Sequence, residues 1–560
     1  MNVETCASSD VTQNWENINF AKARVYVKKL QMRIVKAQQE SRHNKVKTLQ
    51  WMLTHSFYAK ALAVKRVTEN KGKDTSGVDH ELWTTPAAKF KAISKLKRRG
   101  YQPKPLKRVY IPKSNGKKRP LSIPTMTDRA MQTLYKFALE PIAETTADPN
   151  SYGFRSGRCT QDAIVQCYIA LGQPTAAKWI LEGDIKGCFD NINHQWIMEH
   201  IPMDKEILRK FLKCGYIETG SLFPTEVGAP QGGAISPTIC NMVLDGIERK
   251  LKEKYYATTR KGTPINPKVN FIRYADDFIV TGENKELLET GVLPIIKEFM
   301  AERGLTLSPE KTVITHIDDG FDFLGCNIRK YNGKLLTKPS KENTKAFLTK
   351  VRKVIKSNPS IKQEELIRYL NPIINGWVNY HKFNVSSKAF ERVDYEIWRC
   401  LWQWAKRRNL KKGHRWVAKR YFHRIGNRNW TFSVPTNRKM ANGEPVYLRL
   451  VYATDTNIRR FTKIKGKANP FDAKYTQHFE ERETDKLRIS LKGRNILAKL
   501  FYEQKGFCPI CGEKITVDTN YKVHEEQIGN RKIKSMVHPQ CHDITHSLDS
   551  QVEPVLERGL

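Results

Sequence analysis

The tetrapeptide Tyr-Ala-Asp-Asp at residues 274–277 constrains the fold more than any other feature of the sequence. The flanking runs 269–273 and 278–281 alternate and carry β-branched and aromatic residues, which predicts a β-hairpin with Asp276 and Asp277 at its turn. Adjacent carboxylates repel each other, and a hard divalent cation such as Mg²⁺ removes that repulsion because it takes carboxylate oxygens as ligands. An ordinary acidic turn is the commoner fate of an Asp-Asp pair, so the interpretation needs further residues.

A third acid, Asp184, ends the apolar run 179–183, which we interpret as a buried strand. Three carboxylates on neighbouring strands can hold two metal ions about 4 Å apart, which clamp the attacking and leaving oxygens of a phosphoryl transfer. We therefore predict that Asp184, Asp276 and Asp277 are the catalytic residues and Mg²⁺ ligands of a nucleotidyl transferase. Asp190 lies six residues after Asp184, in a pattern that favours a structural helix cap and not a catalytic acid.

Other short motifs surround these acids. They occupy residues 111–113, 117–121, 151–155, 184–189, 230–233, 236–237, 274–277, 307–312 and 321–325. Their order, over about 220 residues, resembles the fingers and palm of a group II intron reverse transcriptase and maturase. Residues 370–381 resemble the signature of the thumb of that family, called domain X.

The resemblance implies an α+β multi-domain protein with right-hand polymerase architecture. Fingers and palm are followed by an α-helical thumb or maturase domain and a small zinc-binding, HNH-like endonuclease domain. The implied nucleotide-binding residues are Lys117, Arg119, Phe189, Gln231, Gly232 and Lys311.

Four of these residues have a stated physical role, and three of the four also have a simpler explanation. Arg119 can grip a triphosphate with two parallel hydrogen bonds. The resemblance places the Phe189 ring under the sugar, where it excludes a 2′-hydroxyl, although a phenylalanine in this pattern is more often core. Gly232 permits close backbone approach, or simply a turn. Lys311 is a candidate proton donor to the leaving pyrophosphate, or a solvated lysine.

A chain of 560 residues is longer than a single-core domain. We predict an N-terminal helical extension with core positions Val27, Leu30, Ile34, Leu49, Met52 and Leu53. The predicted divisions are 1–75 (extension), 76–335 (fingers and palm), 336–455 (helical thumb), 456–490 (DNA-binding connection) and 491–560 (zinc-binding HNH-like domain).

The composition favours a polyanion as partner, because 97 Lys and Arg oppose 57 Asp and Glu for a formal net charge of +40. A membrane surface is the alternative, but the sequence has no run of eighteen apolar residues and no lipidation signal. The N-terminus lacks the pattern of a secretory signal, and eleven mostly scattered cysteines fit a reducing compartment. We therefore expect a cytoplasmic, bacterial-type protein that is associated with the nucleoid when on target DNA.

A dense basic run at residues 406–424 holds nine Lys or Arg and no acid, directly after Trp398, Trp402 and Trp404. Such a run can contact RNA phosphates, and neighbouring aromatic rings can stack on bases. At helical spacing, however, the tryptophans favour a core position, so the RNA-binding prediction falls on the cations. These are Lys406, Arg407, Arg408, Lys411, Lys412 and Arg415.

The C-terminal region carries the donor set of a structural zinc site. Cys508 with Cys511 and His538 with Cys541 form two pairs, each with the two-residue gap that lets both side chains reach one Zn²⁺ ion. The surrounding sequence resembles an HNH endonuclease domain. The histidines that could hold its divalent ion are His524, His542 and His546.

The HNH resemblance is incomplete. That family usually has two adjacent histidines, the second acting as general base, whereas Glu525 follows His524 here. The loop at residues 527–531 is also shortened. Whether the domain cleaves DNA is therefore left open.

The expected function is an RNA-directed DNA polymerase and maturase that binds a group II intron RNA, assists its splicing and copies it during target-primed retrohoming. Its partners would be the intron RNA, a DNA target and primer, and deoxynucleoside triphosphates. Three alternatives stand beside it. They are an RNA-dependent RNA polymerase, which Phe189 disfavours; an RNA-binding splicing cofactor that does not polymerise; and a domesticated reverse transcriptase with little or no endonuclease activity.

Overall fold

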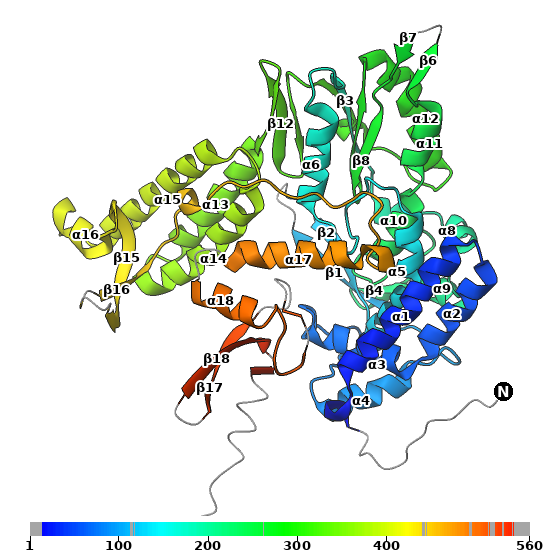
Figure 1. The fold of residues 1–560 in the computed structure, drawn as a ribbon, viewed down its shortest axis with the longest axis horizontal. Coiled ribbons are helices and arrows are strands. Elements are labelled where there is room, and N and C mark those ends of the chain that lie inside the picture. The colour runs from blue at the N-terminus through cyan, green and yellow to red at the C-terminus, as the bar shows by residue number, and fades with distance from the viewer. Residues whose placement is uncertain are drawn as a thin grey trace, which may run out of the picture.

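Figure 1 shows how the fingers, palm and N-terminal helices form one side of the molecule, with the thumb on the other. The computed structural model describes residues 14–542, apart from 113–115, 117, 261–262, 440–442, 444, 492–494, 513, 516–520, 529–530 and 540. None of the helices in this part of the chain is both long and apolar enough to cross a bilayer.

The N-terminal helices α1 (Phe20–Gln39), α2 (His43–His55) and α3 (Phe57–Glu69) pack against the long helix α5 (Met126–Thr146). The predicted core positions are buried with one exception, Met52, which is 36% exposed. Val46, Leu49 and Leu53 form the buried stripe of α2. At 100° per residue, Met52 falls about a quarter turn from that stripe, which explains why its predicted core position is wrong.

The fingers contain a four-stranded sheet in the order β2-β1-β4-β5. Its strands are β1 (Leu106–Pro112), β2 (Lys118–Ile123), β4 (Tyr216–Glu218) and β5 (Ser221–Phe223), and helix α4 (Pro86–Lys95) precedes them. The β1–β2 hairpin carries the described part of the basic fingers motif.

The palm contains an antiparallel sheet in the order β10-β3-β9-β8. Its strands are β3 (Trp179–Asp184), β8 (Asn270–Tyr274), β9 (Asp277–Gly282) and β10 (Val313–His316). Because side chains alternate along a strand, the sheet is apolar on both faces. Leu181, Phe271, Phe278 and Val280 join one core, and Ile180, Ile272 and Ile279 join another that includes α6 (Thr160–Leu171).

Shorter elements complete the fingers and palm. They are η1 (Trp15–Asn17), α7 (Cys188–Asn191), α8 (His194–His200), α9 (Lys205–Leu212), α10 (Ser236–Leu244), α11 (Ile247–Lys254), β6 (Thr258–Arg260), β7 (Thr263–Ile265), η2 (Leu287–Val292), α12 (Leu293–Ala301) and η3 (Pro309–Lys311). A three-stranded sheet of β11 (Phe321–Phe323), β12 (Cys326–Tyr331) and β13 (Lys334–Pro339) then leads to the thumb. The boundary predicted between residues 335 and 336 falls inside β13.

The thumb begins with four helices and ends in a sheet. The helices are α13 (Lys341–Ser357), α14 (Gln363–His381), α15 (Ser387–Arg408) and α16 (His414–Tyr421). The strands are β14 (Phe422–Ile425), β15 (Arg428–Lys439) and β16 (Pro445–Arg449). The predicted helices of the thumb are present, but the prediction did not include this sheet, in which Phe422 and Phe432 on paired strands bury their rings in the same core as Trp404.

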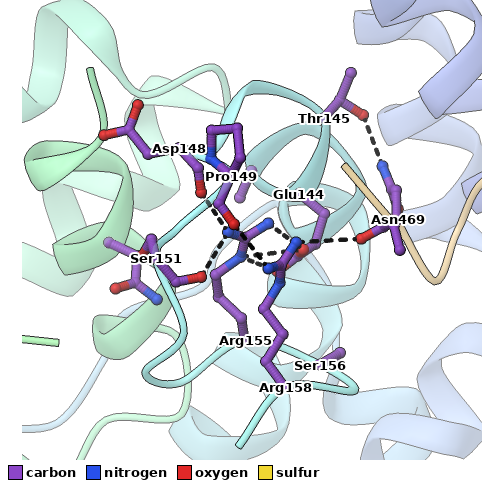
Figure 2. Close-up of polar contacts among 12 residues, drawn as sticks. Glu144, Thr145, Asp148, Pro149, Ser151, Arg155, Ser156, Arg158 and Asn469 are labelled. Carbon is purple, nitrogen blue, oxygen red and sulfur yellow. Dashed lines mark hydrogen bonds and ion pairs between the residues drawn. The ribbon is translucent and has the colours of Figure 1, made fainter. Parts of the chain in front are cut away.

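After the thumb the chain returns across the palm, and α17 (Thr476–Leu491) follows (Figure 1). Figure 2 shows part of this contact: the amide of Asn469 donates to Thr145 on α5 at 3.1 Å, beside the buried ion pair of Arg155 and Glu144 at 2.8 Å. Arg158 donates to the carbonyl of Pro149 at 3.0 Å and to that of Gly466 in the returning segment at 2.7 Å.

The C-terminal elements have a small core of their own. They are α18 (Asn495–Glu503) and the hairpin of β17 (Lys522–Ile528) and β18 (Arg531–Val537). Leu500, Phe501, Met536 and Val537 are among the residues of this core.

Candidate active site and metal centres

The three predicted catalytic acids meet at one end of the palm sheet. Asp184 is the last residue of β3 and lies directly opposite Asp277, the first residue of β9, in the antiparallel register. Asp276 immediately precedes it in the turn, where Ala275 takes a left-handed backbone conformation with φ 58°. Although Asp277 keeps an exposed surface, partial desolvation of its carboxylate, and then the negative charges of Asp276 and Asp184, raise its pKa to about 7.

A crowded set of carboxylates is the donor set that a hard divalent cation prefers. The nearest positive group is Lys311, whose Nζ lies 3.0 Å from Asp184 Oδ2. This hydrogen bond raises the pKa of Lys311, so the lysine stays protonated. One exposed ammonium does not balance three acids, and the oxygen donors therefore fit Mg²⁺.

A buried arginine that the sequence analysis missed supports the catalytic turn. Arg273, at the end of β8, is fully buried, and its Nη2 donates to Asp245 Oδ1 at 2.6 Å. Its Nη1 donates to Asn241 Oδ1 at 3.1 Å and to the carbonyl of Ala275 at 3.2 Å. The sequence did carry a signal, since an arginine inside an apolar strand must find a buried partner.

The motif at residues 151–155 braces the same turn from the other side. The amide of Tyr152 donates to the carbonyl of Arg273 at 2.9 Å, and Asn241 donates to the carbonyl of Gly153 at 2.8 Å. A Cβ on Gly153 would collide with the backbone of Ala275, so the close approach requires glycine. This motif therefore positions the acids.

The loop at residues 230–233 joins the fingers to the palm. Arg119 Nε donates to Gln231 Oε1 at 3.0 Å, and the amide of Ser122 on β2 donates to the carbonyl of Gln231 at 2.7 Å. Gly232 has φ +116°, and a Cβ there would collide with the carbonyl oxygen of Ser122. The structure thus brings Arg119, Gln231 and Gly232 together, whereas Lys117 lies outside the described residues.

Phe189 lies on α7, five residues beyond Asp184, and is 7% exposed. Its ring meets that of Phe154 edge to face with centroids 6.3 Å apart, and its carbonyl accepts the amide of Ala229. The cap predicted at Asp190 is found instead at Asn193, whose side chain accepts the amides that open α8. Asp190 lies inside α7.

The cations of the basic run in the thumb differ in how far the structure exposes them and in what they contact. Arg407, Lys411, Lys412 and Arg415 are exposed, and Lys406 is half-buried. Arg408 donates to the carbonyls of Pro359 at 3.0 Å and Ile361 at 2.6 Å. Trp404 is 5% exposed and belongs to the core, and Trp398 and Trp402 pack against that core.

The four predicted zinc ligands converge. One ligand atom from each of Cys508, Cys511, His538 and Cys541 lies within 4.8 Å of the other three. Three sulfurs and one imidazole within this distance are the donor set of a closed structural Zn²⁺ site.

Two of the three predicted HNH histidines also lie together. The rings of His524 on β17 and His542 meet edge to face with centroids 5.7 Å apart. His546 lies outside the described residues. Glu525, in the position of the expected histidine base, forms an ion pair of 2.6 Å with Lys534.

Comparison with known proteins agrees with this geometry. Residues 111–328 match the reverse transcriptase (RNA-dependent DNA polymerase) family, and residues 15–96 match the N-terminal domain of reverse transcriptase. Protein YkfC of Escherichia coli (strain K12) is 32% identical over 302 residues, which are 47% of this chain and 78% of YkfC. The chain belongs to the reverse transcriptase family. It is an RNA-directed DNA polymerase, and it also carries a group II intron maturase-specific domain, matched at residues 344–422.

More distant relatives link this reverse transcriptase to introns. The group II intron-encoded protein LtrA of Lactococcus lactis subsp. cremoris is 30% identical over 362 residues, 54% of this chain and 60% of LtrA. An uncharacterized 91 kDa protein in the cob intron of Schizosaccharomyces pombe is 27% identical over 60% of this chain and 51% of its own length. The chain thus spans between half and three fifths of these two relatives. A solved telomerase from Candida tropicalis overlaps 57% of this chain and 69% of its own at 14% identity and a TM-score of 0.34, which supports no finer comparison.

Proposed function

We propose that this reverse transcriptase copies a group II intron RNA into DNA from a DNA 3′ end, and that it binds the same RNA to assist its splicing. The observation that carries the proposal is the register of the palm sheet, which sets Asp184 opposite Asp277 with Asp276 beside it. The carboxylates would hold two Mg²⁺ ions, which supply charge neutralisation at the attacking and leaving oxygens.

The remaining residues of the site bind, orient and protonate. Arg119, held by Gln231, presents a guanidinium to the triphosphate of an incoming deoxynucleotide. Phe189 lies on α7, five residues after Asp184, and its ring would fill the space that a 2′-hydroxyl needs. Lys311 is held beside Asp184 with its pKa raised, so it is protonated and placed to donate to the leaving pyrophosphate.

The maturase role is supported by the maturase-specific domain at residues 344–422 and by the relationship to LtrA, a group II intron-encoded protein. A net charge of +40 supplies the attraction to a polyanion. The exposed cations of the basic run, Arg407, Lys411, Lys412 and Arg415, are proposed RNA contacts. The DNA target and primer complete the set of partners.

The C-terminal domain is proposed to be a zinc-stabilised, HNH-like fold with weak or absent cleavage. Cys508, Cys511, His538 and Cys541 would hold the structural Zn²⁺. His524 and His542 could contribute to a second divalent site. The position of the general base is filled by Glu525, which is engaged by Lys534 and is therefore poorly placed to accept a proton from water.

The decisive experiment compares Asp276→Ala and Asp277→Ala with Asp319→Ala, an exposed acid in the turn before β11. Primer extension on an unstructured RNA template should be abolished by the first two and kept by the third. Filter binding of the intron RNA should be unchanged in all three, since affinity comes from distributed cations. Extension above a tenth of wild type in both palm variants would contradict the assignment, and a wild-type protein that binds RNA without extending a primer would favour a splicing cofactor.

A further inference from the structure

A cationic pocket in the thumb lies outside the polymerase site. It has a volume of about 560 Å³ between the C-terminal halves of α13 and α15 and the turn after α13. Its cations are Arg352, Lys356, Arg399, Arg407 and Arg408. Only Arg407 and Arg408 belong to the basic run at residues 406–424. The fold therefore brings together positive charges that are far apart in the sequence.

Helical spacing explains how the pocket is built. Arg352 and Lys356 are four residues apart on α13, and Arg399, Gln403 and Arg407 follow at intervals of four on α15. Residues at this spacing lie one above the other on a helix surface, so each helix presents one row of polar side chains. The helices pack through buried residues such as Val351, which brings the two rows to opposite walls of the pocket.

The pocket has far more positive than negative charge. Glu396 accepts from Arg352 at 2.6 Å and lies 3.9 Å from Arg399. Among the residues that the structure describes, no acid lies within ion-pair distance of Lys356 or Arg407. Lys356 lies one turn from Arg352 without an acid of its own, and an anion in the pocket would balance its charge. The dipole of α15 favours cations in its last turn but does not account for Arg399, two turns earlier.

The one aromatic residue that lines the pocket, Trp404, does not present its ring for stacking on a base. Trp404 is 5% exposed, and its indole Nε1 donates to the carbonyl of Asn358 at 2.9 Å. The guanidinium of Arg408 lies 4.5 Å from the centroid of its ring. A ligand would therefore be recognised by its charge and shape and not by its bases.

We infer that this pocket binds the phosphodiester backbone of the folded intron RNA, at a fixed point of the RNA surface and independently of local sequence. The inference rests on the proposed maturase function, and all lining residues fall within the maturase-specific match at residues 344–422. The pocket has room for a phosphate and its flanking sugars. Guanidinium groups on both walls suit phosphate oxygens, which favours RNA over an acidic peptide.

The first test removes Lys356 and Arg407, which have no acidic partner among the described residues, together with Arg399, which lies 3.9 Å from Glu396. The triple variant Lys356→Gln, Arg399→Gln, Arg407→Gln leaves Arg352 with Glu396 and Arg408 with its carbonyl partners. A matched control, Lys345→Gln, Lys388→Gln, Arg392→Gln, removes three exposed cations of the same two helices outside the pocket. Each phosphate contact contributes about 0.9 to the slope of log affinity against log salt, so three lost contacts should lower the slope by about 2.7. The control should lower it by less than about one and should extend a primer on an unstructured template as wild type does.

The second test needs no variant, because Cys400 lines the pocket and is half-buried. In the full-length wild-type protein, bound intron RNA should protect Cys400 from iodoacetamide while Cys159, half-buried in the palm, keeps its reactivity. Equal slopes for the two triple variants would refute RNA binding in the pocket, and so would a lack of protection of Cys400 by bound RNA. Neither result would contradict the proposed maturase function. Protection by polyglutamate or by primer–template, but not by intron RNA, would equally refute RNA binding in the pocket. A wild-type protein that does not bind intron RNA at all would defeat both proposals.

Discussion

Replacing Arg482 by Met should release the segment that returns from the thumb to the palm. Arg482 on α17 donates to both carboxylate oxygens of Asp162, at 3.2 and 3.1 Å, and the two side chains are 7% and 0% exposed. Asp162 also accepts the amide of Ile464 at 2.7 Å. The substitution leaves a fully buried carboxylate without its cation, which costs about 3–5 kcal/mol when one partner of a buried pair is removed.

This cost should appear as local opening and not as global unfolding. Arg482 belongs to the returning segment, whereas Asp162 belongs to α6 of the palm, so undocking α17 lets water reach the carboxylate while the palm stays folded. At the lower figure, about 3 kcal/mol raises the opening constant roughly 140-fold. Hydrogen–deuterium exchange over residues 476–491 measures this change directly.

Two further variants make the test specific. Lys474→Met removes an exposed lysine that pairs with the partly buried Asp472 in the same segment, and should change exchange by less than about threefold, since an ion pair with an exposed cation contributes little. Adding Asp162→Asn to Arg482→Met should recover part of the protection, because no charge is then buried alone. If Arg482→Met exchanged no faster than Lys474→Met, the ion pair would not be what docks α17.

Three further predictions concern the nucleotide and metal sites. Phe189→Val should raise the efficiency of ribonucleotide incorporation relative to deoxynucleotides, measured as a ratio of kcat/KM values, and an equal loss with both sugars would assign the ring to the core. Cys508→Ser with Cys511→Ser should abolish binding of one Zn²⁺ per chain and loosen residues after about 490, as read by metal analysis and proteolysis. Second-strand cleavage of a duplex target by the protein with its intron RNA should be weak or absent, and robust cutting that His542→Ala removes would refute this.

The catalytic hairpin was predictable because its signals are local. Alternating apolar residues on both sides of residues 274–277 predict paired strands, and the apolar run before Asp184 predicts a third. The structure places Asp184 directly opposite Asp277. The register itself was not predictable, since nothing near Asp184 specifies which strand will pair with it.

The supporting residues were missed because their partners are distant in sequence. Arg273 bonds Asp245 and Asn241, which lie 28 and 32 residues away. The thumb sheet was missed for a different reason. Its strands carry basic and polar residues between the aromatic ones, and the preceding helical periodicity gives no sign of where pairing between β14 and β15 begins.

Some cations of this chain are bound by other groups of the protein, and others are left to bind nucleic acid. The structure distinguishes the two kinds, and the sequence does not. Residues 406–424 were assigned to RNA because they are dense in cations, and residues 456–490, which are also basic and polar, because they correspond in place to the DNA-binding region of the family. In the returning segment, however, Arg482 is buried against Asp162, and the backbone carbonyl of Gly466 accepts from Arg158 of the palm. The two cations in these contacts, Arg482 and Arg158, are already engaged by protein and cannot also release counterions from a phosphate backbone. The thumb cations Lys356 and Arg407 have no such acidic partner in the described part of the chain. The salt dependence of RNA binding should therefore arise more from the thumb than from the segment beyond it.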